Sequence, residues 1–373
     1  MSQPNNYGFE EEAALLKESA RRYFAEKLPV DQLHALVAGD PAPDSTPRCA
    51  WREDLWAELV ELGWTALTVP EAAGGLEMPW VAVAGLVEES GRAAFPSPLL
   101  STLSCSAVLA QCGDSAHGAL GEIAAGAAAT LAVMDAEGSF EAGAVRARDG
   151  ELSGEAFYVQ DLLKCSRLLV LAMEDAGPAW YWCATDADGV SLHPDAIVDL
   201  TRDQGRVRFE AVRAQPLAAD GALAWSAALP IIWVLYSADM VGAAEWQLQT
   251  TVEYAQQRKQ FDHTLGFFQA VKHDLVNVMV DIDASKSLLY SAACGLDYDS
   301  AERAASLAHM AKAAASDTAA FASGRSVQCH GGIGFTWEAY LHLYFKRQKH
   351  SQLLWGDAAW HRGELARRYV DAA

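Results

Sequence analysis

The sequence predicts an α+β protein with an N-terminal helical domain, a middle antiparallel β-barrel or β-sandwich domain and a C-terminal four-helix bundle. The first observation behind this is size, because 373 residues, 51% of them hydrophobic, suffice for two or three cores. The second is a hydrophobic period that changes from helical to strand-like near residue 128 and back near residue 225. The third is that the last helical segments are long and alanine-rich, as in antiparallel bundles.

The first domain is expected over residues 1–126. Segments such as LWAELVELGW carry apolar residues at three- and four-residue spacing, which is typical of amphipathic helices. Breaks rich in Pro, Gly and Asp separate them, as in GDPAPDSTP at 39–47 and VPEAAGGLEMP at 69–79.

The middle domain is expected over residues 127–220. Runs such as RLLVLAME and GRVRFEAV are short, rich in β-branched and aromatic residues, and separated by Gly and Asp turns. This pattern predicts an antiparallel sheet inserted between helical parts.

The last domain is expected over residues 221–373. One apolar stripe follows Val234, Ala238, Val241 and Leu248, and a second runs through 271–289. The uncharged stretch 221–238 is nearly long enough to cross a bilayer, but it contains Pro230 and runs into a charged helix. We therefore expect a buried core helix and no membrane span.

Charge and cysteine usage exclude several functions. The net charge of −21 argues against nucleic acid or an anionic membrane as the main partner. Seven scattered cysteines form no CxxC pair, and no His/Cys cluster has metal-ligand spacing. The first residues lack a signal-peptide pattern, so a reduced, cytoplasmic protein without a metal is expected.

Two motifs interrupt the C-terminal helices. RKQFDHTLGFFQ begins with Arg258 at the end of a helix and continues through an aromatic turn. The helix dipole alone favours such an arginine, but an arginine fork between phenylalanine walls also suits a pyrophosphate. QCHGGIGF places Gly331, Gly332 and Gly334 after another helix. Three glycines in four positions favour a turn whose backbone approaches a ligand or partner.

These turns, with the preceding β domain, resemble the acyl-CoA dehydrogenase family. The order of pieces matches over nearly the whole chain: LWAELVELGWTALTVPEAAGG and LVEESGRAAFPSPL resemble the family's N-terminal helices, and VDLTRDQGRVRFEAV its closing β strands. The resemblance implies FAD as cofactor and oxidation of an acyl-CoA thioester to the 2,3-enoyl-CoA. It also implies a carboxylate that removes the α proton while hydride leaves Cβ for the flavin.

The family's dimers build each FAD site from two chains, and the resemblance assigns the ADP-binding half to this one. The residues that match that half lie in the two turns. They are Arg258, Gln260, Phe261, Leu265, Phe268, Gln269, Gln328, Gly331 and Gly332.

The half that holds the flavin ring departs from the family. MDAEGSF at 134–140 lacks the family's first β-domain loop pattern, and YVQD at 158–161 replaces its aromatic-Ile-Thr-Asn strand. The usual catalytic Glu, counted from Glu338, falls on Trp355, and a second family location falls at about Ile232. Neither side chain accepts a proton, so no catalytic residue is assigned.

Two carboxylates are weak alternatives for the base. Glu245 lies on the apolar stripe, where burial would raise its pKa, although a salt bridge to a neighbouring helix explains it equally well. Asp357 lies two places past Trp355.

Three hypotheses follow. In the first, the chain is the non-catalytic subunit of a heteromeric α2β2 acyl-CoA dehydrogenase, like those of actinobacterial steroid side-chain degradation. A homologous partner then carries the Glu, and electron-transfer flavoprotein or a similar acceptor takes the electrons. In the second, a self-sufficient acyl-CoA or acyl-carrier dehydrogenase uses a displaced base. In the third, the chain is a catalytically dead scaffold subunit.

Overall fold

The computed structural model describes residues 3–38, 50–141, 143–217 and 220–371. The predicted loop at 39–47 lies outside them, as does Cys49. The chain forms two compact units. Unit 1 takes in the described residues within 1–38, 79–95 and 233–373, and unit 2 those within 39–78 and 96–232.

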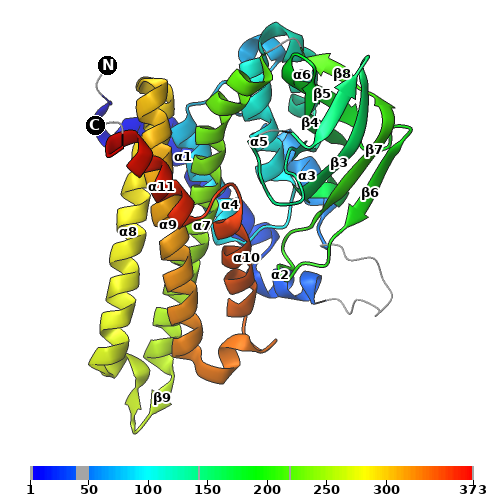
Figure 1. Cartoon of the computed structure of the whole chain (residues 1–373). Helices are drawn as coiled ribbons and strands as arrows, with labels where there is room; N and C mark the ends of the chain where they lie inside the picture. Colours follow the sequence, from blue (N-terminus) through cyan, green and yellow to red (C-terminus); the bar gives the residue numbers. More distant parts are fainter. Residues whose placement is uncertain (1–2, 39–49, 142, 218–219, 372–373) are drawn as a thin grey trace. The chain divides into compact units, whose positions relative to one another are not determined.

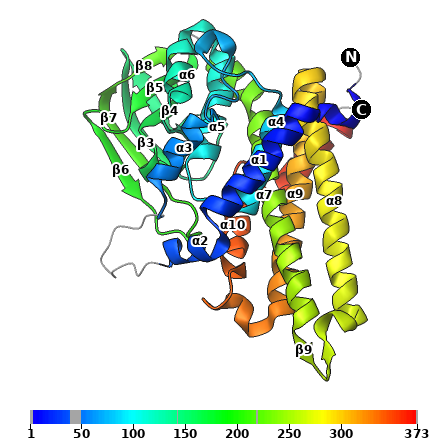
Figure 2. The same cartoon turned by 180° about the vertical axis from the view of Figure 1, so that it is seen from behind.

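Unit 1 is helical (Figure 1). Its helices are α1 (Glu11–Lys27), α2 (Val30–Val37), α4 (Trp80–Arg92), the part of α7 (Gly221–Gln257) from Trp233 onward, α8 (Gln269–Tyr298), α9 (Ala301–His330), α10 (Leu341–Leu353) and α11 (Ala358–Tyr369). The 3₁₀ turn η1 (Asn5–Gly8) precedes α1, η5 (Leu265–Phe267) lies between α7 and α8, and η6 (Gly331–Phe335) lies between α9 and α10. Figure 2 shows α1 lying along α4.

The long helices of unit 1 pack through small residues, as the predicted stripes require. Val278 and Ile282 of α8 form a buried cluster with Ala244 of α7 and Ala322 of α9. Alanine at such contacts lets helix backbones approach closely. The predicted C-terminal helical bundle is confirmed.

A buried ion pair ties α7 to α10. The Arg347 guanidinium lies 2.6 Å from the Asp239 carboxylate, and both side chains are almost fully buried. Ser351 donates a further hydrogen bond to Asp239, at 3.2 Å. Seven residues after Asp239 along α7, Trp246 stacks on Tyr344 of α10 with ring centroids 3.8 Å apart.

Unit 2 contains an eight-stranded sheet with helices α3 (Glu53–Glu61), α5 (Leu99–Leu109) and α6 (His117–Ala124) and 3₁₀ turns η2 (Glu71–Ala73), η3 (Ala110–Ala116) and η4 (Leu162–Lys164). The strand order is β6-β7-β3-β2-β4-β5-β8, and β1 also pairs with β4. The strands are β1 (Ala129–Ala132), β2 (Val145–Arg148), β3 (Glu151–Gln160), β4 (Arg167–Glu174), β5 (Gly177–Ala184), β6 (Val190–Pro194), β7 (Gln204–Arg213) and β8 (Gln215–Leu217).

The predicted middle β domain is present, but its sheet is not purely antiparallel. Strands β1 and β2 both pair with β4 in parallel. For β2 the reason is connectivity, because the chain passes over β2 on its way from β3 to β4. Inward and outward residues alternate as predicted: Val145 and Ala147 are buried, whereas Arg146 and Arg148 are exposed.

Helix α7 contains the uncharged stretch of the sequence. Among the described residues it is the one helix long and apolar enough to pass for a membrane span, and 89% of its most apolar window is buried. Burial of that extent supports the expected core helix.

Candidate cofactor-binding turns

The Arg258 turn is a tight hairpin after α7. Strands β9 (Lys259–Gln260) and β10 (His263–Thr264) pair antiparallel, with Gln260 opposite His263. Phe261 and Asp262 form the bend with φ values of 52° and 62°, as a type I′ turn requires. The backbone of Arg258 anchors the base of the hairpin, since its N–H donates to Tyr254 O and its C=O accepts from Leu265 N, both at 2.8 Å.

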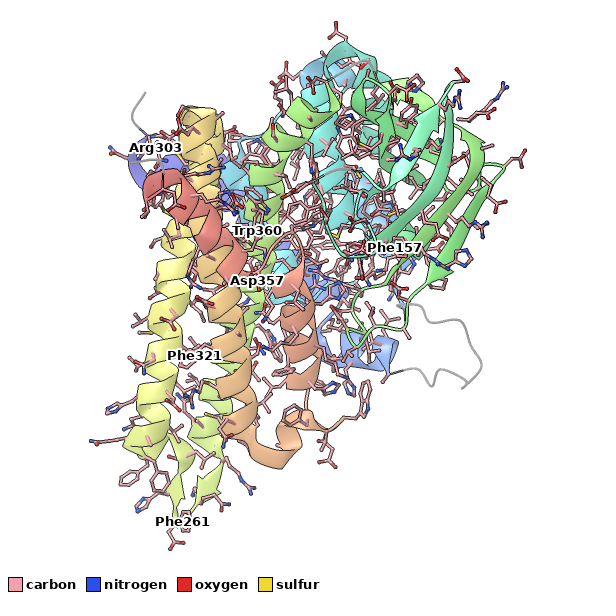
Figure 3. All side chains as sticks on the ribbon, viewed as in Figure 1. Phe157, Phe261, Arg303, Phe321, Asp357 and Trp360 are labelled. Carbon is pink, nitrogen blue, oxygen red and sulfur yellow. The ribbon has the colours of Figure 1, made fainter. Side chains whose placement is uncertain are left out.

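Aromatic rings stiffen this turn. His263 stacks on Phe267 with ring centroids 4.1 Å apart, and the edge of Phe268 meets both Phe267 and Phe261. Phe261 is 86% exposed at the tip of the hairpin (Figure 3). Phe261 and the 56% exposed Phe267 together form an exposed apolar surface on the turn, as binding sites often do.

The glycine turn begins where α9 ends at His330. Gly331 has φ 64°, and its N–H closes the helix on Val327 O and Gln328 O. A Cβ added at Gly331 or Gly332 would meet no atom within 4 Å, so this backbone is open to an approaching group. Gly334 differs, because a Cβ there would lie 3.1 Å from Val327 O; it serves packing.

The two turns are neighbours. Tyr254, one helical turn before Arg258, stacks on His330 with ring centroids 4.0 Å apart and planes inclined by 21°. Gly266 also lies close to α7, since a Cβ there would be 3.2 Å from Ala255 O. His330 is buried, which lowers its pKa, and its Nδ1 lies 2.9 Å from Ser326 O.

The nine predicted site residues thus gather at one end of unit 1. Arg258, Gln260 and Phe261 are exposed in the hairpin, Leu265 and Phe268 are partly buried beneath it, and Gln269 begins α8. Gln328, Gly331 and Gly332 are exposed at the end of α9. A guanidinium, open backbone and flat rings form a surface suited to a nucleotide diphosphate.

The position expected for a base holds a buried tryptophan. Trp355 is 5% exposed and adopts a left-handed backbone, with φ 59°, before Gly356 with φ 95°. A Cβ at Gly356 would come within 2.5 Å of the Trp360 ring. The second expected location, Ile232 in unit 2, is completely buried and apolar.

Both alternative carboxylates are engaged in other contacts. Glu245 forms ion pairs with Lys286 and, at 3.5 Å, with Arg92. The Asp357 carboxylate caps α11, accepting a 2.8 Å hydrogen bond from the backbone N–H of Trp360. These contacts favour structural roles for Glu245 and Asp357.

Sequence reasoning missed the group that holds the Trp355 turn. Lys312 of α9 is fully buried, and its ammonium donates to Gly356 O at 2.9 Å and to Gln352 O at 3.3 Å. Burial lowers the pKa of Lys312 to about 7. Beside it, His309 and His361 share a 2.8 Å contact between their Nδ1 atoms. A lysine within the alanine-rich stripe of α9 was the available signal.

Residues 158–161 of unit 2, which were predicted to lack the flavin-facing pattern, bond to neighbouring groups of the same chain. The Gln160 amide donates to Gln204 Oε1 and to Tyr158 O, both at 2.8 Å. Asp161 accepts from Ser101 Oγ at 2.7 Å and from the buried Lys164 ammonium at 2.6 Å. These polar groups are therefore satisfied by contacts within the chain.

Comparisons with known proteins show the family to which the chain is similar. The family models for the C-terminal and N-terminal domains of acyl-CoA dehydrogenases match residues 227–370 and 10–119. The chain is 33% identical over 339 residues to acyl-CoA dehydrogenase IpdE2 of Mycobacterium tuberculosis, covering 90% of this chain and 91% of that protein.

Solved structures of similar proteins have the same fold. A Tcur3481–Tcur3483 steroid ACAD variant superposes with a TM-score of 0.86 at 26% identity, covering 97% of this chain and 98% of that chain. A chain of the ChsE4–ChsE5 complex of Mycobacterium tuberculosis superposes with a TM-score of 0.83 at 22% identity, again over 97% and 98%, and shows the fold alone.

The fold and the family matches therefore place the chain among the flavoprotein oxidoreductases of the dehydrogenase class. More closely, the chain belongs to the acyl-CoA dehydrogenase family, whose members use FAD.

Proposed function

We propose that this chain is one subunit of a heteromeric, FAD-dependent acyl-CoA dehydrogenase and supplies the ADP-binding half of a shared FAD site. The observation that carries the proposal is the Tyr254–His330 stack, which joins the Arg258 hairpin to the glycine turn. Glu245 is ion-paired and Asp357 caps a helix, which supports the proposal that the catalytic base comes from a partner.

The two turns offer chemistry that suits the ADP part of FAD. The planar fork of Arg258 would pair with the pyrophosphate through charge-assisted hydrogen bonds. The open backbone at Gly331 and Gly332 would accommodate the nucleotide closely, and Phe261 and Phe268 would supply apolar walls. When bound, FAD supplies a hydride acceptor for the carbon β to the thioester.

The reaction also requires a base that this chain does not supply. The α proton of a thioester is weakly acidic, so a positioned carboxylate must remove it as the enolate-like charge develops. Trp355 cannot accept a proton. The partner is accordingly a homologous subunit that carries a Glu at the position corresponding to Trp355. The β domain of that partner holds the flavin ring.

Substrate, acceptor and location follow by analogy. One similar structure is that of a steroid ACAD, and this likeness supports a steroid side-chain CoA thioester as substrate. Electron-transfer flavoprotein or a comparable acceptor would reoxidise the flavin, and the complex would be cytoplasmic.

Co-expression tests the proposal. The chain is produced alone and with a family member that carries the Glu, and flavin absorbance and acyl-CoA oxidation are measured. The proposal predicts a colourless, inactive chain and a yellow, active complex. Active yellow protein from this chain alone would instead support a self-sufficient enzyme with a displaced base.

A further inference from the structure

A row of alternating charges crosses unit 1 at a distance from the two turns. Each member lies within 4 Å of the next, and cations stand at both ends. In order, the row is Arg21, Glu89, Lys17, Glu88, Lys286, Glu245 and Arg92.

The centre of the row is the buried carboxylate of Glu88. Lys17 Nζ lies 2.7 Å from one of its oxygens and Lys286 Nζ lies 2.9 Å from the other. The Tyr290 hydroxyl also donates to Glu88, at 2.5 Å. One carboxylate thus holds two ammonium groups in fixed positions.

The row carries a surplus of positive charge. It contains four cations and three carboxylates, so its formal charge is +1 in a chain whose net charge is −21. The two lysines of the row, rather than its terminal arginines, are the cations that an anion in the neighbouring cavity would meet.

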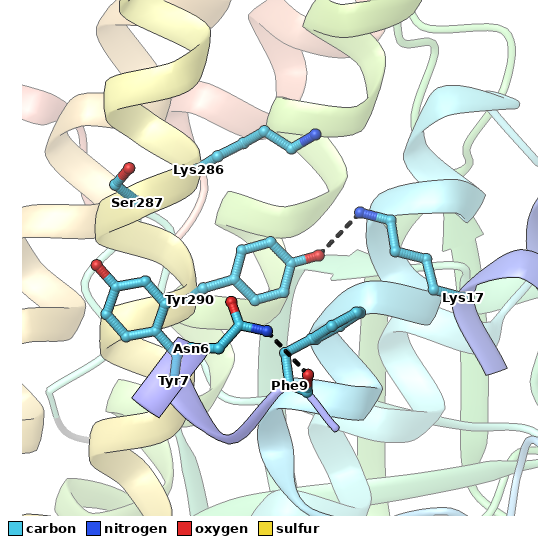
Figure 4. Close-up of a pocket in the computed structure, with 7 residues that line it drawn as sticks. All are labelled: Asn6, Tyr7, Phe9, Lys17, Lys286, Ser287 and Tyr290. Carbon is cyan, nitrogen blue, oxygen red and sulfur yellow. Dashed lines mark hydrogen bonds between the residues drawn. The ribbon is translucent and has the colours of Figure 1, made fainter. Parts of the chain in front are cut away.

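A cavity of about 310 Å³ opens onto the two lysines (Figure 4). Its polar lining is Lys17, Lys286 and Ser287, and Asn6 contributes from the N-terminal segment. Its apolar lining is aromatic: Tyr7, Phe9 and Tyr290. Its volume lies at the lower end of the range for small-molecule sites, roughly 300–1,000 Å³.

The lysines keep hydrogen-bonding capacity toward a ligand. An ammonium group has three N–H donors. Lys17 makes close contacts with Glu88 and with the Tyr290 hydroxyl at 2.9 Å, and Lys286 makes close contacts with Glu88 and Glu245. Glu89 lies 3.8 Å from Lys17, beyond hydrogen-bond distance, so one donor of each lysine remains, which matches the two oxygens of one carboxylate.

The rings restrict what such an anion carries. The edge of Phe9 meets the ring of Tyr290 with centroids 5.3 Å apart, and Tyr7 is 37% exposed at the cavity mouth. Flat aromatic groups pack between such rings in offset or edge-on arrangements.

We propose that this cavity is a second ligand site, distinct from the cofactor turns, and that it binds a small carboxylate bearing an aromatic ring. The carboxylate lies between Lys17 and Lys286, and the ring lies against Tyr7 and Phe9. The site is roughly 25 Å along α8 from Gln269, at 1.5 Å per residue. It therefore stands independently of the proposed dehydrogenase role.

Calorimetry on the full chain tests the site, with benzoate as probe and benzamide as its uncharged counterpart of equal shape. Benzoate is expected to bind saturably at one site, about tenfold or more tighter than benzamide, and more weakly at high salt. Two substitutions probe opposite walls: Lys286→Met removes a donor, and Tyr7→Ala removes a ring that takes no part in the charge row.

Each substitution is expected to weaken benzoate binding by about tenfold or more. Tyr369→Ala, at an exposed tyrosine of α11 that does not line the cavity, is expected to leave it unchanged. Melting curves show whether Lys286→Met loses benzoate binding because it misfolds. If it does, the binding measured for Tyr7→Ala tests the site. Absence of saturable benzoate binding, equal binding of benzamide, or normal binding by a folded Tyr7→Ala protein would overturn the proposal.

Discussion

Tyr254 of α7 and His330 of α9 stack face to face, and this contact places the Arg258 hairpin beside the glycine turn. The two motifs are about seventy residues apart in the chain, yet they share one end of unit 1. The proposed cofactor surface depends on this packing, because neither turn alone presents both the cation and the open backbone.

Replacing His330 with Ala should loosen that surface. The substitution removes an aromatic contact and is expected to cost about 1 kcal/mol of unfolding free energy. In the complex with a partner it should lower flavin retention while Arg258 stays in place. Denaturant unfolding and flavin absorbance measure the two effects. His273→Ala, at an exposed histidine of α8, serves as control and should change neither.

The Asp239–Arg347 pair should be the more sensitive of two ion pairs. Asp239→Asn removes the negative charge that lies 2.6 Å from the buried Arg347 guanidinium, which is expected to cost about 3–5 kcal/mol of unfolding free energy. Asp317→Asn breaks the exposed pair with Arg362 and should cost no more than about 1 kcal/mol. Equal losses of unfolding free energy in the two variants, measured by chemical denaturation, would show that burial does not determine how much each ion pair contributes to stability.

The Trp355 turn should not tolerate a side chain at Gly356. Gly356→Ala forces a Cβ into the Trp360 ring at a left-handed backbone position, and a loss of about 2–4 kcal/mol of unfolding free energy is expected. Gly363→Ala in α11 is the matched control. A Cβ there meets nothing within 4 Å, so this change should stabilise the helix by up to about 1 kcal/mol. Thermal melts separate the two outcomes.

Acid should destabilise unit 1 through buried histidines. Burial lowers the pKa of His361 to about 2 and that of His309 to about 4, from an ordinary value of 6.5. As the pH falls below 6.5, these histidines therefore bind protons in the unfolded chain but stay neutral in the folded chain. Stability is full above that pH and should drop by at least about 2 kcal/mol by about pH 5.

Denaturant unfolding between about pH 7 and pH 5 checks this slope. His361→Gln should flatten it, whereas His263→Gln, at an exposed histidine, should leave it unchanged. An unaltered slope in His361→Gln would assign the acid sensitivity to other groups.

The sequence located the two turns but not their contact. Glycine spacing and the Arg-x-Gln-Phe pattern are local signals, and the hairpin and the end of α9 fall where those signals lie. The stacking of Tyr254 on His330 depends on how two long helices rotate and slide, which local periodicity does not determine. The parallel pairings of β4 were missed for a related reason, since they depend on which strands the chain skips.

Buried polar groups were the least predictable part of the site. Glu245 sits on an apolar stripe that suggested a desolvated base, but Lys286 and Arg92 reach it from other helices. Lys312 went unnoticed within its alanine-rich segment, although it anchors the backbone after Gln352. Partners this distant in sequence are fixed only by the tertiary fold.

The central claim is that this chain holds the ADP part of a flavin whose ring and base belong to a partner. The most direct measurement is the flavin content of the purified complex carrying Arg258→Ala, compared with Arg303→Ala at an exposed arginine near the start of α9. The account predicts that Arg258→Ala releases the flavin from an intact complex while Arg303→Ala retains it. Full flavin occupancy in the Arg258→Ala complex would contradict it.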